Sequence, residues 1–127
     1  MSFQITALYA SILTVMVIVL ANVVSAKRGR SGISILDGGD ADLALWMRRH
    51  GNLVENAPLA LLLMAFCEAR GLGPTWLHAI GIVLIASRAL HLVGLDAKRV
   101  TSPLRIAGGV GTQLAMLAAA AYLLWPY

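Results

Sequence analysis

Arg48, Asn52 and Glu55 are spaced so that a single helix face would carry all three side chains. The intervals are four and three residues, and an α-helix turns by about 100° per residue. A guanidinium group recognises carboxylates, and a carboxylate can hold an ammonium group. This face therefore predicts a pocket for a small zwitterion, with Glu55 about two turns, roughly 10 Å, deeper than Arg48.

A structural role is the alternative explanation for the same residues. Arg48 and Arg49 can extend along the membrane toward the lipid headgroups, and Glu55 can pair with an arginine. Asn52 and Glu55 fit this alternative less well, because neither side chain can reach far. His50 points away from the Asn52 face and is expected to mark the membrane interface.

A second group of polar residues is divided between two helices further along the chain. Arg88 and His91 are three residues apart on one face, and Arg105 follows Pro103 at the start of the last helix. Positively charged flanks of membrane spans commonly look like this. However, a cation at a helix N-terminus is disfavoured by the helix dipole. Arg105 is therefore expected to have another partner, and an anionic ligand is one candidate.

The elements that must position these side chains are membrane spans. Of the 127 residues, 59% are hydrophobic and 13% are charged, about half the charged share of an average soluble domain. A membrane helix needs about 20 apolar residues. The sequence predicts an all-α membrane protein, a single domain at 1–127 that forms an antiparallel bundle of four transmembrane helices, at about 3–26, 41–70, 75–95 and 103–125.

The ends of the predicted helices follow from local signals. The segment 29–39 is rich in Gly, Ser and Asp and predicts a loop, with Asp40 or Asp42 as the N-cap of the second helix. Small residues run through the fourth helix, including Gly108 and Thr112, and this spacing lets helix backbones approach closely.

The basic residues predict the orientation in the membrane. Lys and Arg gather in and around the first and third connections, whereas the second connection offers only Arg70. By the positive-inside rule, both termini lie on the non-cytoplasmic side. Trp76 and the end at 125–127, which includes Tyr127, would lie in the aromatic belt of that side.

Several other functions are not supported by the residue pattern. The net charge of +4 comes from bases beside apolar stretches, without interleaved aromatic residues, so no nucleic-acid partner is expected. Three histidines and one cysteine lack metal-ligand spacing, so no metal site is predicted. Cys67 lies in an apolar run and is expected to be a small buried hydrophobe.

The segment Arg48-x-His50-x-Asn52-x-x-Glu55-x-x-Pro58, with Arg88 and Pro103-x-Arg105 downstream, resembles the MAPEG family of membrane proteins in eicosanoid and glutathione metabolism. Its members include microsomal glutathione transferases, leukotriene C synthase and microsomal prostaglandin E synthase. The segment 36–40 and the apolar run after the motif resemble the bacterial branch. The resemblance covers nearly the whole chain and implies a homotrimer in the lipid bilayer of a bacterial inner membrane.

The resemblance also implies roles for the residues. Glutathione would bind between neighbouring subunits near the cytoplasmic face, as a co-substrate. Glu55 would face its amino group, and Arg105 would stabilise its thiolate. The full set of residues that the resemblance assigns to glutathione binding is Arg48, His50, Asn52, Glu55 and Arg88.

The expected function is a glutathione transferase or peroxidase that acts on small lipophilic electrophiles or hydroperoxides. Two positions depart from the pattern of active relatives, because Asn56 and Leu95 stand where many of them have tyrosine. The loss of these hydroxyl donors leaves a non-catalytic lipid-binding or lipid-presenting protein as the alternative. A small membrane transporter is a third, weaker alternative, because it does not require this arrangement of Arg, Asn and Glu.

Overall fold

A computed structural model describes residues 2–126 and folds them into four long α-helices. They are α1 (Gln4–Ser31), α2 (Ala41–Ala69), α3 (Pro74–Gly94) and α4 (Pro103–Leu124), with no strand among the described residues. Each helix is long and apolar enough to cross a membrane. The predicted all-α class and the four spans are confirmed. Tyr127, which was predicted to join the aromatic belt, lies outside the described residues.

The first helix is longer than the sequence predicted. It continues to Ser31 instead of ending near residue 26, so the predicted loop begins only at Gly32. Lys and Arg are good helix formers, and Arg28 and Arg30 in the last turn suit the negative end of the helix dipole. The helix ends where Gly32 adopts a left-handed backbone with φ 69°. The basic residues therefore end the apolar span but not the helix.

The second and fourth helices begin at side-chain caps. Asp40 is the N-cap of α2, and its side chain accepts hydrogen bonds from the backbone N–H groups of Asp42 and Leu43. Ser102 caps α4 in the same way, by accepting from the N–H of Arg105. These caps set the point at which each helix starts and therefore the direction in which its first polar residues project.

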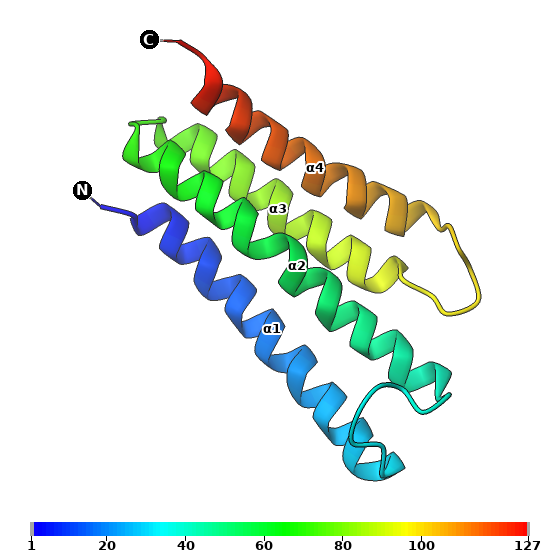
Figure 1. Cartoon of the computed structure of the whole chain (residues 1–127). Coiled ribbons are helices and arrows are strands. Elements are labelled where there is room, and N and C mark those ends of the chain that lie inside the picture. The colour runs from blue at the N-terminus through cyan, green and yellow to red at the C-terminus, as the bar shows by residue number, and fades with distance from the viewer. Residues whose placement is uncertain (1, 127) are drawn as a thin grey trace.

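Both termini lie at one end of the bundle, together with the α2–α3 connection, and the other two connections lie at the opposite end (Figure 1). The most extensive contact is between α3 and α4, and α1 packs against α2 and α3. Leu13, Leu53, Met64 and Leu84 fill the core between the helices. Many large apolar side chains, such as Leu117 at 64% exposure, point outward. An apolar exterior of this kind is suited to lipid.

Two charged residues at the end of α2 cap other helices. The carboxylate of Glu68 accepts from the N–H groups of Ile5 and Thr6, at 3.0 and 2.8 Å, and so caps the N-terminus of α1. Arg70 donates to main-chain carbonyl oxygens at the C-terminal end of α4, including that of Leu123 at 2.7 Å. Both contacts satisfy helix-end groups that would otherwise lack partners. The α2–α3 turn thereby joins the first and last helices.

Candidate functional site

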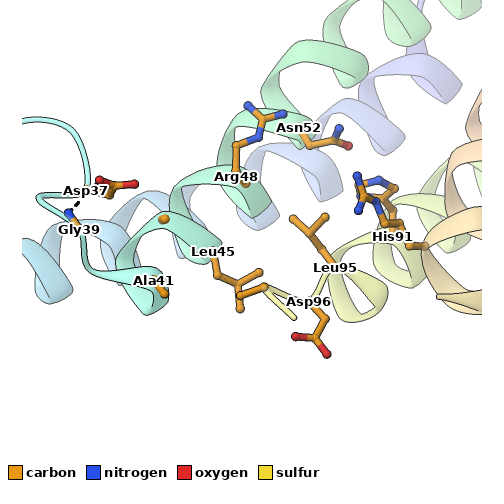
Figure 2. Close-up of a pocket in the computed structure, with 12 residues that line it drawn as sticks. Asp37, Gly39, Ala41, Leu45, Arg48, Asn52, His91, Leu95 and Asp96 are labelled. Carbon is orange, nitrogen blue, oxygen red and sulfur yellow. Dashed lines mark hydrogen bonds between the residues drawn. The ribbon is translucent and has the colours of Figure 1, made fainter. Parts of the chain in front are cut away.

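A cavity of about 520 Å³ lies at the end of the bundle that holds the α1–α2 and α3–α4 connections (Figure 2). Both connections contribute to its wall, together with the N-terminal half of α2, the end of α3 and the start of α4. The lining residues are Asp37, Gly39, Ala41, Ala44, Leu45, Arg48, Asn52, His91, Leu95, Asp96, Ala97 and Arg105. A volume of this size is within the range of small-molecule sites.

The structure brings together three of the six residues that the family resemblance assigned to glutathione and its thiolate. Arg48, Asn52 and Arg105 all line the cavity, although Arg105 comes from a different helix. The cavity wall does not include the other three, Glu55, His50 and Arg88. Of these, Glu55 and Arg88 bond to residues that do line it, whereas no hydrogen bond or ion pair in the described part of the chain links His50 to the site.

Arg48 and Glu55 form an ion pair along the face of α2. The Nη1 of Arg48 lies 3.3 Å from Oε1 of Glu55, and both side chains are 59% exposed. The pairing of Glu55 with an arginine, which was the structural alternative, is thus observed. Glu55 acts on the cavity indirectly in this structure, by orienting the arginine that lines it.

Arg88 lies behind the cavity wall and fixes Asn52. It is 3% exposed, and its Nη1 donates to Oδ1 of Asn52 at 2.6 Å. Nε donates to the hydroxyl of Thr112 at 2.7 Å, and Nη2 donates to the carbonyl oxygen of Gly108 at 3.3 Å. Because its oxygen accepts from Arg88, Asn52 has its amide N–H groups left for a ligand. Thr112 was expected only to assist packing, and its role as a polar partner was missed.

Arg49 turns into the bundle instead of toward the headgroups. Its Nη2 donates to the carbonyl oxygen of Leu95 at 3.1 Å, and its guanidinium lies 4.6 Å from the ring of Trp46. The carbonyl of Leu95 is at the C-terminal end of α3, where a cation is favourable. The suggestion that Arg49 extends along the membrane is therefore wrong. Arg49 holds α2 against the end of α3 beside the cavity.

His91, which was grouped with Arg88 and Arg105 in the sequence but given no role toward a ligand, lines the cavity. Its side chain is buried, at 9% exposure. Three arginines, Arg88, Arg105 and Arg48, are close enough to act on its ring electrostatically. The spacing of His91 from Arg88 indicated a shared face, and only the position of α4 shows that this face borders a cavity.

Arg105 is held at the start of α4 by the adjoining connection. Its Nη1 donates to the carbonyl oxygen of Val100 at 2.6 Å, and its backbone N–H donates to the hydroxyl of Ser102. Arg105 was expected to have a partner other than its own helix, and one such partner is this carbonyl of the α3–α4 connection. A carbonyl does not neutralise the positive charge, so Arg105 still offers a cation to the cavity.

The two positions at which tyrosine is absent have different surroundings. Leu95 is buried and gives the cavity an apolar wall. The amide of Asn56 donates to the backbone oxygen of Asn52 at 2.8 Å, within the same helix.

Among residues 2–126, no group of His, Cys, Asp and Glu side chains could hold a metal ion.

Comparisons with known proteins connect this architecture to a family. The "Inner membrane protein YecN" of Escherichia coli strain K12 is 37% identical over 92 residues, which are 72% of this chain and 70% of YecN. The YecN of Escherichia coli O6:H1, strain CFT073, matches to the same extent. No solved structure matches the chain. The MAPEG family model matches residues 6–125, so nearly the whole chain is covered and the protein belongs to the MAPEG family.

Proposed function

We propose that this protein binds glutathione in the cavity and uses the thiolate as a transferase or peroxidase. The single observation that carries the proposal is that Arg48, Asn52 and Arg105 line one cavity at the connection end of the bundle. They provide two guanidinium groups, of which that of Arg48 also pairs with Glu55, and an amide for a ligand that has two carboxylates and a thiol. Family membership supports the same ligand, because the MAPEG family includes glutathione transferases as well as non-catalytic members.

The chemistry assigned to Arg105 is activation of the thiol. A free thiol is mostly protonated near neutral pH, and a nearby guanidinium lowers its pKa. The resulting thiolate would form a C–S bond with a lipophilic electrophile as the leaving group departs. With a lipid hydroperoxide, the thiolate would attack the terminal oxygen and form an S–O bond as the O–O bond breaks. The departing alkoxide takes up a proton to give the alcohol, and a second glutathione converts the resulting sulfenic acid to the disulfide and water. Arg105 serves this role well because no carboxylate among residues 2–126 forms an ion pair with it.

The proposed working unit is a homotrimer of antiparallel four-helix bundles in the bacterial inner membrane. The Arg48–Glu55 pair supports assembly, since both side chains are largely exposed on a helix that crosses the membrane. A charged pair facing lipid is unfavourable, and a neighbouring subunit would cover it. The relative YecN is, by its name, an inner membrane protein, which supports the proposed location.

The proposed enzymatic function can be tested by titrating glutathione into the purified protein and recording the ultraviolet absorbance of the thiolate. The wild type should bind glutathione and give the thiolate signal. Arg105→Ala should lose most of that signal, and transferase activity should fall at least about 100-fold. Arg99→Ala is the matched control, because Arg99 lies exposed in the adjoining α3–α4 connection and does not line the cavity. A thiolate signal that survives Arg105→Ala would contradict the role assigned to Arg105.

A non-catalytic lipid-binding role is the second candidate, and the wall of the cavity favours it. Leu95 supplies an apolar surface in place of a hydroxyl donor, and the amide of Asn56 is bonded within its own helix. Glutathione binding with no thiolate signal in the wild type would support this candidate over the enzyme. Restoring hydroxyls with Leu95→Tyr should then raise the thiolate signal.

A further inference from the structure

We propose that Asp37, not Glu55, binds the ammonium group of the glutathione-like ligand and so makes the site selective for a zwitterion. This inference rests on the proposed function, and it assigns the recognition of one particular group of the ligand. The sequence resemblance gave that role to Glu55.

The charges around the cavity are separated into two regions. Arg48, Arg105 and the ring of His91 lie on the sides formed by the helices, whereas the two carboxylates, Asp37 and Asp96, come from the α1–α2 and α3–α4 connections. In Figure 2, Asp37 lies on the loop side of the cavity, away from Asn52 and His91. A ligand with carboxylates at one end and an ammonium group at the other matches this separation.

The carboxylate of Asp37 is fixed in place without being neutralised. One oxygen, Oδ1, accepts from the backbone N–H of Gly39 at 3.0 Å, within a turn in which Gly38 and Gly39 have φ values of 56° and 84°. Among residues 2–126, no cation pairs with Asp37. The second oxygen can therefore accept from an ammonium group, and the turn holds it ready to do so.

Glu55 is less suited to this role, because it already has a cationic partner. Its two oxygens lie 3.3 and 3.5 Å from the guanidinium of Arg48, and its side chain is not part of the cavity wall. An ammonium group at Glu55 would have to compete with that guanidinium. Asp37 requires no such exchange.

The helical side of the cavity also carries a polar side chain, His91, that is free to bond to a ligand. His91 is nine-tenths buried and lines the cavity, yet its ring makes no hydrogen bond within the described part of the chain. Its ring nitrogens are not fully enclosed, so a ligand in the cavity can reach them. A ligand that bonds to His91 and carries negative charge toward Arg48 and Arg105 would place its ammonium group at the opposite, loop side.

Binding of glutathione and of N-acetylglutathione to the purified protein, measured by calorimetry, tests the proposal. The acetyl group removes the ammonium charge and leaves both carboxylates and the thiol. The wild type should bind glutathione about tenfold more tightly than the acetylated peptide. Asp37→Asn should weaken glutathione binding by about the same factor and leave the acetylated peptide unaffected. The variant retains the Oδ1 acceptor for Gly39, so the turn should persist.

Asp96→Asn is the matched control. Asp96 also lines the cavity and accepts a backbone hydrogen bond, from Lys98, but its carboxylate points away from Arg48 and Asn52 (Figure 2). This variant should keep the tenfold preference for glutathione.

The possible results separate this inference from the proposed function. If Glu55→Gln abolishes the preference and Asp37→Asn preserves it, Asp37 is not the ammonium site, while glutathione binding stands. Equal binding of the two peptides by the wild type also overturns the inference alone. If neither peptide binds to the wild type, both the inference and the proposed function are wrong.

Discussion

Arg88 is a buried cation whose partners in the chain are all neutral. It donates to Asn52, Thr112 and Gly108, and among residues 2–126 no carboxylate forms an ion pair with it. Transferring a charge from water to such a position is costly even when hydrogen bonds replace those to water. Its role is best understood through Asn52, whose orientation it sets from behind the cavity wall.

Arg88→Lys should therefore damage binding as well as stability. An ammonium group on a flexible stem cannot reproduce the planar set of bonds to Asn52, Thr112 and Gly108. We expect the free energy of unfolding to fall by about 1.5–3 kcal/mol, the range for hydrogen bonds to charged groups. Glutathione affinity should fall as well. Chemical unfolding in detergent and calorimetry measure the two effects.

Arg99→Lys provides the comparison for this prediction, because Arg99 is exposed and outside the cavity. It should change neither quantity. If Arg88→Lys behaves like Arg99→Lys in both measurements, Arg88 does not position Asn52.

The spacing of Arg48, Asn52 and Glu55 predicted their shared face, but it could not predict how the three would pair. Relative to Arg48, a helical turn of about 100° per residue places Asn52 roughly 40° to one side and Glu55 roughly 20° to the other. In the structure, Asn52 meets Arg88 of α3, and Glu55 remains exposed beside Arg48. Periodicity specifies the face of a helix, whereas the neighbouring helix determines which part of that face becomes buried.

At the scale of elements, the site depends on how closely α3 and α4 approach. A Cβ added at Gly108 would lie 2.4 Å from the backbone nitrogen of His91 and 2.5 Å from the carbonyl oxygen of Ser87. These are backbone atoms, so a rotamer change cannot relieve the clash. The lack of a side chain at Gly108 keeps the helices close and leaves its carbonyl oxygen accessible to Arg88.

Gly108→Ala should destabilise the bundle by about 1–3 kcal/mol, the usual effect of overpacking. It should also disturb the cavity, since His91 and Arg88 both lie at this crossing. Thermal unfolding in detergent, together with glutathione binding, measures these changes.

Gly109→Ala is a close control for the same helix. Its added Cβ would meet only Cδ2 of His91, at 4.0 Å, which is ordinary contact. Because alanine is the better helix former by about 1 kcal/mol, Gly109→Ala should be neutral or stabilising. If the two variants destabilise the bundle equally, the close approach of α3 and α4 at Gly108 is not the cause of the lost stability.

Helix ends show what local sequence signals can and cannot predict. Asp40 was one of two predicted caps for α2, because capping depends on residues next to the helix start. Glu68 caps α1 from more than 60 residues away, and no local pattern could indicate that contact. The extension of α1 to Ser31 was missed because the end of an apolar stretch does not require a helix to end.

For the whole molecule, the two ends of the bundle differ in charge and in what their charged side chains contact. The cavity and most basic residues lie at the end with the α1–α2 and α3–α4 connections. At the other end, the charges of Glu68 and Arg70 are used to cap α1 and α4. Basic residues in and beside a short connection, such as those at the cavity end, favour the cytoplasmic side for that connection. A site at that end would be open to cytoplasmic glutathione, with lipophilic substrates arriving from the bilayer.

This arrangement predicts that both termini face the non-cytoplasmic side, and labelling of single cysteines tests it. Ser2→Cys lies near the N-terminus, and Ser34→Cys lies in the α1–α2 connection; both positions are exposed. In intact spheroplasts, a membrane-impermeant thiol reagent should label only Ser2→Cys, and permeabilisation should make Ser34→Cys reactive. The native Cys67 is 0% exposed, so the unmodified protein should remain unlabelled and serves as the control. Labelling of Ser34→Cys in intact spheroplasts would reverse the orientation and place the cavity where cytoplasmic glutathione cannot reach it.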